Sequence, residues 1–283
     1  MMQLGQFELI TISGGRYWID GGTMFGVVPR LLWERQFEVD DQHRIPQCTH
    51  CLLVRTGDQN ILIDTGYGSK LPDKQRRHIS AEPGNPLLDS LSEHGIAADQ
   101  IDVVVFSHLH FDHAGGATQF AADGSLTRTF PNAEYVVQRR EWANATAGYP
   151  ELRGAYQDEN LLPLRDSGRL RLIDGNVEIV PGLRALVTGG HTEGHQAIVI
   201  RSEGQTAVYV GDVCATWRHL PVLWCLGYDV QMQQTRRAKA DLLGQIADAD
   251  WWAFSPHDAD HAAVKLQRDS RKDFAIRESL ERC

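Results

Sequence analysis

Several features that mark other classes of protein are absent from this sequence of 283 residues. No stretch approaches the roughly 18 uninterrupted apolar residues that a membrane-spanning helix requires. Residues 1–12 lack the basic segment and the cleavage site of a signal peptide. We therefore expect neither membrane insertion nor secretion, and we predict a cytoplasmic protein.

Cysteine is sparse, with 5 residues in the chain. An odd number at low density argues against a disulfide framework and for a reducing compartment. Cys48 and Cys51 have the spacing of half a zinc site, but no second pair follows. We predict that Cys51 is an inward-facing strand residue and that Cys214 contributes to packing.

Positive charge is also in short supply, because 28 Lys and Arg face 37 Asp and Glu, a formal net charge of −9. Phosphate backbones are bound by concentrated Lys and Arg. The densest basic clusters, residues 74–77 and 236–239, are short. We therefore expect no nucleic acid partner.

The chain is rich in short β-type runs separated by turn residues, with a few helical patterns between them. The predicted strands are residues 7–12, 50–55, 60–64, 102–107, 134–138, 184–188, 197–201, 206–210 and 251–254. The predicted helices are residues 86–94, 139–147 and 231–249. This order favours packed sheets covered by helices, and no low-complexity linker divides the chain. We predict a single α/β domain over residues 1–283.

Two loops, residues 21–33 and 217–228, are unusually apolar. Such loops either cap the core or an interface of a homodimer, or they form a wall for a substrate. The second interpretation, extended to the aromatic residue of the histidine segment below, predicts these substrate-binding residues: Met24, Phe25, Trp33, Phe111, Trp217, Leu223 and Trp224.

Histidine is the unusual residue, with 12 in the chain, and it is concentrated in the segment His108-Leu109-His110-Phe111-Asp112-His113 after an apolar strand. Residues i and i+2 of an extended segment project to the same side, so His108 and His110 can hold one ion. Asp112 and His113 continue into the turn and can reach a second ion. Imidazole with carboxylate suits Zn²⁺, Fe, Mn or Co better than Ca²⁺ or Mg²⁺.

Three further metal-competent residues follow predicted strands, namely His191, Asp212 and His257. A lone residue in that position is usually a turn cap, but the repeated context predicts one site assembled from several strand ends. His195 and His261 lie four residues after His191 and His257. Gly194 interrupts helical continuity there, and seven ligands already suffice, so we do not include them.

These motifs, in this order, resemble the metallo-β-lactamase superfamily, and residues 61–66 resemble its second-strand motif. The resemblance implies an αββα four-layer sandwich, two mixed sheets flanked by helices, with the metal centre at one edge. It implies two divalent metal ions, most commonly Zn²⁺ with Fe, Mn or Co as alternatives. One metal would take His108, His110 and His191, the other Asp112, His113 and His257, with Asp212 as the bridge. Asp64 would orient a ligand histidine.

Within that superfamily, residues 108–116 are similar to the metal loop of N-acyl homoserine lactone lactonases, including Phe111. Residues 20–29 resemble an N-terminal segment of quorum-quenching lactonase-like sequences. The resemblance implies that a metal-bridging hydroxide opens a small-molecule lactone or ester, with Asp112 as the proton carrier. The sequence departs from the pattern at Glu193, where Pro is usual, and in lacking a Tyr shortly after Asp212, where Trp217 is the nearest aromatic residue.

Three alternatives remain open at this point. One is a mononuclear iron oxidoreductase of the same fold, similar to sulfur dioxygenases, which metal analysis would reveal. Another is a phosphotriester or phosphodiester hydrolase, because apolar loops suit a hydrophobic triester as well as an acyl chain. The third is a metal-stabilised binding protein without turnover.

Overall fold

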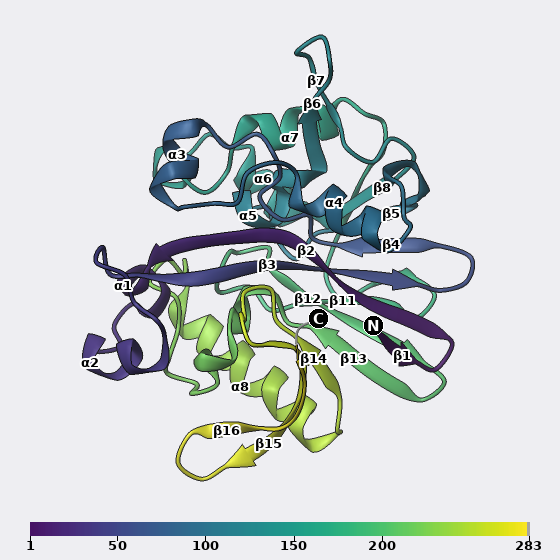
Figure 1. The fold of residues 1–283 in the computed structure, drawn as a ribbon. Coiled ribbons are helices and arrows are strands. Elements are labelled where there is room, and N and C mark those ends of the chain that lie inside the picture. Colours follow the sequence, from purple (N-terminus) through teal and green to yellow (C-terminus); the bar gives the residue numbers. More distant parts are fainter. Residues whose placement is uncertain (282–283) are drawn as a thin grey trace.

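Two seven-stranded sheets stack face to face in the computed structural model of this chain (Figure 1). The structure describes residues 1–281, without the side chain of Glu281, so Cys283 lies outside the described residues. The first sheet has the strand order β1-β2-β3-β4-β5-β8-β9. Its strands are β1 (Met2–Leu4), β2 (Phe7–Asp20), β3 (Arg44–Arg55), β4 (Asn60–Ile63), β5 (Val103–Val105), β8 (Glu134–Gln138) and β9 (Leu170–Ile173).

The second sheet follows the chain in order, from β10 to β16. Its strands are β10 (Glu178–Val180), β11 (Leu183–Val187), β12 (Gln196–Ser202), β13 (Gln205–Tyr209), β14 (Trp252–Phe254), β15 (His261–Asp269) and β16 (Asp273–Glu281). A separate hairpin joins β6 (Thr118–Phe120) and β7 (Leu126–Arg128). Both large sheets are mixed, because β4, β5, β8 and β9 pair in parallel, as do β13 and β14, while the other pairs are antiparallel.

Helices cover the outer face of each sheet (Figure 1). The α-helices of the described chain are α1 (Gly21–Phe25), α2 (Arg30–Trp33), α3 (Asp73–His78), α4 (Pro86–Glu93), α5 (Phe111–Ala114), α6 (Arg139–Ala145), α7 (Asp158–Arg165) and α8 (Met232–Asp248). Helices α4, α6 and α7 lie above the first sheet in Figure 1, and α8 lies below the second. Among residues 1–281, no helix has the length and apolar character needed to cross a bilayer.

Strand alternation explains how the layers hold together. In β4, Ile61 and Ile63 pack into the core between the two sheets, whereas Leu62 faces the helices of the first layer. Leu242 and Ile246 of α8 pack against the outer face of the second sheet. Three apolar cores therefore separate four layers, which confirms the predicted αββα fold class. Cys51 and Cys214 lie in these cores, as expected.

The elements differ from prediction mainly where tertiary pairing extends a strand. β2 continues to Asp20, although the sequence predicted a strand that ends at residue 12. The register with β3 shifts between Ser13 and Arg16, so Gly14 and Gly15 lie in a bulge rather than a terminating turn. The hairpin of β15 and β16 was missed, as was α7, which contains Pro163.

The two apolar loops meet at a buried histidine. His219 stacks on Phe25 with ring centroids 4.5 Å apart. Its Nε2 donates to the Met24 carbonyl oxygen at 2.8 Å, and its Nδ1 accepts from the Thr216 hydroxyl at 2.9 Å. Burial and the nearby charge of Lys239 lower the pKa of His219 to about 3. The folded protein therefore holds this imidazole neutral.

We expect His219 to lower the free energy of unfolding as the pH falls. The unfolded chain binds this proton near pH 6.5, whereas the folded protein binds it only near pH 3. The contribution of neutral His219 to the free energy of unfolding is therefore complete above pH 6.5 and is lost as the pH falls from 6.5 to 3. Between pH 7 and pH 5 the loss from His219 should be about 2 kcal/mol. His219→Gln should remove that part of the pH dependence in urea unfolding of the metal-free protein. His94→Gln, at an exposed position, is the control, and parallel pH profiles for wild type and His219→Gln would contradict this expectation.

Candidate metal centre

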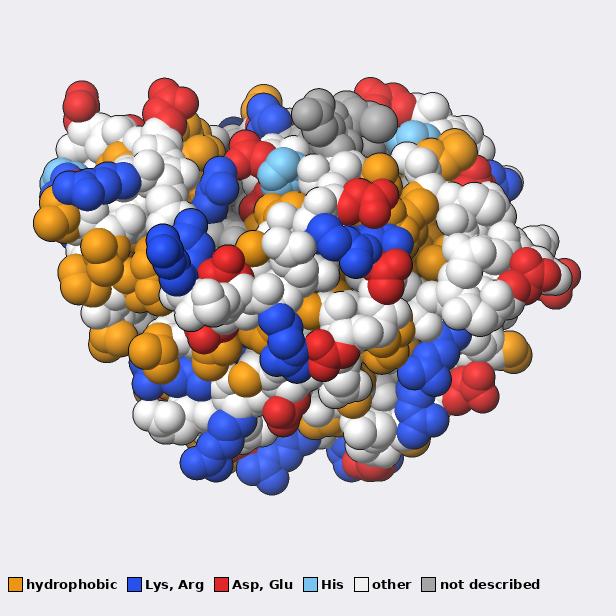
Figure 2. Space-filling model, turned by 90° about the horizontal axis from the view of Figure 1, so that it is seen from below, with side chains coloured by type: hydrophobic (Ala, Val, Ile, Leu, Met, Phe, Trp, Pro, Cys, Tyr) orange, Lys and Arg blue, Asp and Glu red, His pale blue; other side chains and the backbone are white. Residues whose placement is uncertain are grey.

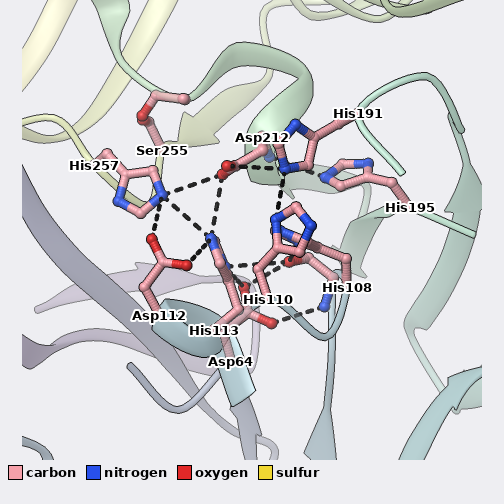
Figure 3. A network of polar contacts seen from close by, with 12 residues as sticks. Asp64, His108, His110, Asp112, His113, His191, His195, Asp212, Ser255 and His257 are labelled. Carbon is pink, nitrogen blue, oxygen red and sulfur yellow. Dashed lines mark hydrogen bonds and ion pairs between the residues drawn. The ribbon is translucent and has the colours of Figure 1, made fainter. Parts of the chain in front are cut away.

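Seven side chains converge at one edge of the sandwich, where strands of both sheets end (Figure 3). His108 and His110 follow β5, His191 follows β11, Asp212 follows β13 and His257 follows β14. The short helix α5 begins immediately after His110 and carries Asp112 and His113. The structure thus brings together all the residues that the sequence predicted as metal ligands.

The ligand atoms fall into three overlapping groups, each with all its atoms within 4.8 Å of one another. These groups are His108, His110 and His191; Asp112, His113 and His257; and His108, His113 and Asp212. The first two coincide with the two ligand sets that the resemblance implied, and the third contains the residue expected to be the bridge. The assignment of each residue to an ion stays a prediction.

Ring nitrogens face each other in a way that a cation would stabilise. The Nε2 atoms of His113 and His257 are 3.2 Å apart. Nδ1 of His113 donates to Asp64 Oδ2 at 2.8 Å, and Nδ1 of His257 donates to the Cys48 carbonyl oxygen at 2.7 Å. Both partners are acceptors, so in the neutral rings the two Nε2 atoms present lone pairs to each other. Two nitrogens bound tetrahedrally to one Zn²⁺ lie about 3.3 Å apart.

The other half of the cluster has the same character. His191 Nδ1 donates to Asp229 Oδ1 at 2.8 Å, which leaves its Nε2 facing His110 Nδ1 at 3.0 Å. Ser107 Oγ donates to Asp64 and so receives Nδ1–H of His108 at 3.0 Å. Nε2 of His108 is consequently a buried lone pair with no hydrogen-bond partner. A buried nitrogen lone pair without a hydrogen-bond partner is what a metal ligand presents to its ion.

Asp212 joins the two halves electrostatically. Its Oδ1 lies 3.2 Å from His257 Nε2 and its Oδ2 lies 3.4 Å from His191 Nε2. Burial raises the pKa of Asp212, but His257, His113 and His191 outweigh burial and hold that pKa well below its usual range. Conversely, burial lowers the pKa of His113, and the charges of Asp212, Asp112 and Asp64 overcome burial and raise it.

The centre contains more negative charge than its protein surroundings neutralise. The carboxylates of Asp64, Asp112, Asp212 and Asp229 are buried here, and within residues 1–281 none of them forms an ion pair with Lys or Arg. Buried carboxylates require a compensating positive charge. Nitrogen and carboxylate donors around this charge fit Zn²⁺, Fe, Mn or Co. The residues present therefore fit divalent cations.

Two contacts of the cluster were not predicted. Asp229 holds His191, and the hydroxyl of Tyr17 in β2 donates to Asp112 Oδ2 at 2.8 Å. Neither residue belongs to a spacing motif. The only sequence signal for Asp229 is a carboxylate placed just after an apolar loop, and Tyr17 lies beyond the predicted end of its strand.

His195 supports the centre from outside the ligand groups. Its Nε2 accepts the backbone N–H of Asp212 at 2.9 Å, and burial lowers the pKa of His195 to about 3. Gly211 has a positive φ of 58°, and a Cβ there would lie 2.5 Å from His195 Nε2. His195 thus fixes the backbone of Asp212. His261 lies in β15 and belongs to none of the three ligand groups within the described residues.

A pocket of about 630 Å³ opens directly onto the metal cluster. His110, Asp112 and Asp212 are part of its lining. Most of the remaining wall is apolar. Its apolar side chains are Trp18, Ile19, Ile79, Phe111, Leu152, Ala155, Tyr228 and Val230, and its polar side chains are Asp20, Thr23, Gln42, Arg44, His78 and Glu151.

The predicted substrate wall needs correction, because only Phe111 among its seven residues lines this pocket. Met24, Phe25, Trp33 and Trp224 pack together in a separate core cluster, and Trp217 packs in the core beneath α8. Leu223 is 65% exposed at the surface. The apolar side chains of the two loops pack mainly on each other, and of these loops only Thr23 and Tyr228 line the pocket. Composition alone does not reveal this arrangement.

Exposed apolar side chains do remain on these loops. Figure 2 shows such side chains gathered at its left edge, on the side where α1 and α2 lie in Figure 1. Val27, Leu31 and Leu32 are 70%, 59% and 47% exposed. A homodimer interface, one of the alternatives that the sequence left open for these loops, stays a prediction.

The structure places both features in which the sequence departs from the lactonase pattern, namely Glu193 and the missing tyrosine after Asp212. Glu193 turns away from the cluster, since its Oε2 accepts from Arg140 Nε at 2.7 Å and Asn144 Nδ2 at 3.0 Å. A tyrosine does reach the pocket, although not from the position near Asp212 in the chain. Tyr228 lines the wall with its ring 5.5 Å from the ring of His191.

The chain is similar to known lactonases in sequence and in fold. An N-acyl homoserine lactonase from Bacillus thuringiensis is 30% identical over 168 residues, which is 56% of this chain and 60% of the lactonase. The chain thus matches less than two thirds of the length of that relative. AidC, a dizinc quorum-quenching lactonase crystallised with a product, superposes with a TM-score of 0.79 at 22% identity, over 100% of this chain and 96% of AidC.

A crystal structure from Staphylococcus aureus, described as that of a probable metal-dependent hydrolase, matches along its whole length. It has a TM-score of 0.91 at 33% identity and covers 99% of both chains. The family model of the metallo-beta-lactamase superfamily matches residues 47–276, a range that contains every residue of the three ligand groups. The chain belongs to the metallo-beta-lactamase superfamily.

Proposed function

We propose that this protein is a metal-dependent hydrolase that opens a lactone or cleaves an ester whose apolar arm lies along the pocket. The proposal rests on the contact between the metal cluster and the pocket, because Asp112 belongs to a ligand group and also lines the pocket. N-acyl homoserine lactones combine a compact ester with an apolar chain, and the relatives from Bacillus thuringiensis act on that class. We propose the same substrate class here.

The reaction needs a nucleophile, an activated carbonyl and a proton carrier. Divalent cations in the two ligand groups would lower the pKa of a water molecule to near neutrality and polarise the substrate carbonyl. Of the two cluster carboxylates that line the pocket, Asp112 is the more exposed, with 11% of its side chain accessible against 3% for Asp212. It would accept the proton of the attacking water and deliver it to the leaving alkoxide oxygen.

Tyr17 keeps that carboxylate in place. Its hydroxyl is bonded to Asp112 Oδ2, and its ring packs edge-on against Phe111 and His257. Because Tyr17 is buried and its hydroxyl is a donor, rotation of Asp112 would cost this hydrogen bond. Positioning of a proton carrier within hydrogen-bond reach of its substrate is the main structural requirement of such catalysis.

Two other reactions are compatible with the same donors and pocket. A mononuclear iron oxidoreductase would use one ligand group with iron, and a phosphotriester hydrolase would use both groups on a hydrophobic triester. The pairing of two complete ligand groups favours the two-metal hydrolase, and the substrate range distinguishes esters from triesters.

Metal analysis tests the proposal first. We expect about two transition-metal ions per chain in active protein, loss of lactone or ester hydrolysis after chelation, and recovery on adding Zn²⁺, Mn²⁺ or Co²⁺. Elemental analysis and turnover are measured on the same samples. One iron per chain in fully active protein, with no gain from added metal, would support the oxidoreductase instead.

Asp112→Asn should preserve the fold and reduce kcat by about 10²–10⁴-fold, because an amide cannot carry the proton. Circular dichroism, metal content and kcat are compared with those of Asp248→Asn, an exposed carboxylate paired with Arg268. Tyr17→Phe should cause a smaller loss in kcat. If Asp112→Asn keeps both metal and near-normal turnover, the proton carrier is another group.

The pocket wall predicts a dependence on chain length. Each additional buried methylene should improve kcat/KM up to about fourfold, from about 0.8 kcal/mol, until the pocket is full. Trp18→Ala should flatten this trend while leaving a short substrate nearly unaffected. Trp224→Ala is the matched control, because Trp224 packs in a core cluster outside the pocket. If Trp18→Ala lowers kcat/KM equally for all chain lengths, Trp18 does not contact the apolar chain of the substrate.

A further inference from the structure

A fully buried carboxylate lies behind the metal cluster and belongs to none of its ligand groups. Glu141 is at the start of α6 and is 0% exposed. Its Oε1 accepts the backbone N–H of Leu109 at 3.0 Å and the hydroxyl of Tyr156 at 3.0 Å. Its Oε2 accepts the hydroxyl of Thr192 at 2.5 Å. Three donors from three separate segments therefore converge on one side chain.

Two of these donors belong to the segments that carry the three-histidine group. Leu109 lies between His108 and His110, and Thr192 follows His191 directly. His110 Nδ1 and His191 Nε2 are 3.0 Å apart although they are 81 residues apart in the chain. Glu141 is thus a direct link between the two segments that must be held at this distance.

The third donor restricts one of the rings. The ring of Tyr156 lies 5.2 Å from that of His110, with an interplanar angle of 50°. Its hydroxyl is anchored on Glu141 Oε1, the same oxygen that holds Leu109. The carboxylate therefore fixes the backbone before His110 and also the aromatic neighbour of its side chain.

The helix that carries Glu141 is a rigid support. Trp142 packs in the core of the first layer, and a Cβ at Gly194 would lie 2.3 Å from the backbone N of Glu141. The loop that contains His191 therefore lies directly on α6. Burial raises the pKa of Glu141, and the hydrogen bonds from Thr192, Leu109 and Tyr156 oppose that rise. No Lys or Arg of the described chain forms an ion pair with it.

We infer that Glu141 is a positioning residue, which holds the His108–His110 segment and the His191 loop at the spacing that a cation requires. An apolar side chain would fill the same space without the cost of burying a carboxylate, but it would leave the Leu109 N–H unpaired and the two segments unlinked. The inference rests on the proposed metal-dependent function. It concerns the protein before and during metal binding, so it is testable without substrate.

The test compares Glu141→Leu and Glu141→Gln with wild type. Glutamine keeps one oxygen for Leu109 and Tyr156, and its amide can donate to Thr192 Oγ1, so most of the link survives. Leucine removes the hydrogen bonds to Leu109, Tyr156 and Thr192. The matched control is Glu193→Gln, a carboxylate at the same loop and helix that contacts Arg140 but neither Leu109 nor Tyr156. Thr192→Val removes a single donor and serves if Glu141→Leu does not fold.

Metal-free proteins are titrated with Co²⁺ against a chromophoric chelator, and the visible absorption of bound Co²⁺ is recorded. We expect Glu141→Leu to weaken Co²⁺ binding 10–100-fold and to change the spectrum, Thr192→Val to weaken it less, and Glu141→Gln and Glu193→Gln to stay within about threefold. Unchanged affinity and spectrum in Glu141→Leu, or in Thr192→Val where the former does not fold, would overturn the inference. An equal loss in Glu141→Gln would overturn it too, because charge would then act in place of the hydrogen bonds. Absence of Co²⁺ binding by wild type would instead refute the proposed function.

Discussion

Four histidines of the metal cluster donate hydrogen bonds outward from Nδ1, and this leaves their Nε2 atoms facing the middle of the cluster. The acceptors are Ser107, Asp64, Asp229 and the Cys48 carbonyl oxygen. An imidazole free to rotate could share its proton with a neighbouring ring, and the cluster would then satisfy itself. With their outer nitrogens occupied, the neutral rings of His113 and His257 cannot hydrogen-bond to each other, and a cation between them would satisfy both lone pairs. The chemistry of the site depends on this constraint.

The constraint can be met only by elements from both sheets. Asp64 follows β4 of the first sheet and holds His113, whereas His257 follows β14 of the second sheet and bonds back to Cys48 in β3. Both sheets therefore supply ligands, and the first sheet also holds a ligand of the second. The cluster therefore lies at the edge where strands of both sheets end, and its ligand set is complete only when both sheets are in place.

The ligands were predictable because they lie in short segments that follow strands, and a strand with the segment after it is a local signal. The residues that hold the ligands were less predictable. Only Asp64 has a motif of its own, whereas Asp229, Glu141 and Tyr17 reach the centre through tertiary contacts with no fixed spacing. The sequence also predicted the αββα fold correctly, but it placed Trp224 and its apolar neighbours on the substrate because composition does not distinguish a core cluster from a pocket wall.

The bulge in β2 shows how one local irregularity links binding to chemistry. Gly15 has a positive φ of 110°, and a Cβ there would lie 2.0 Å from the Tyr67 hydroxyl, so glycine is required. The strand continues beyond this bulge to Asp20. Alternation then directs Tyr17 to Asp112 and the next residue, Trp18, to the pocket wall. A strand that ended at residue 12 would supply neither contact, so the bulge at this glycine pair positions both the proposed proton carrier and the pocket wall.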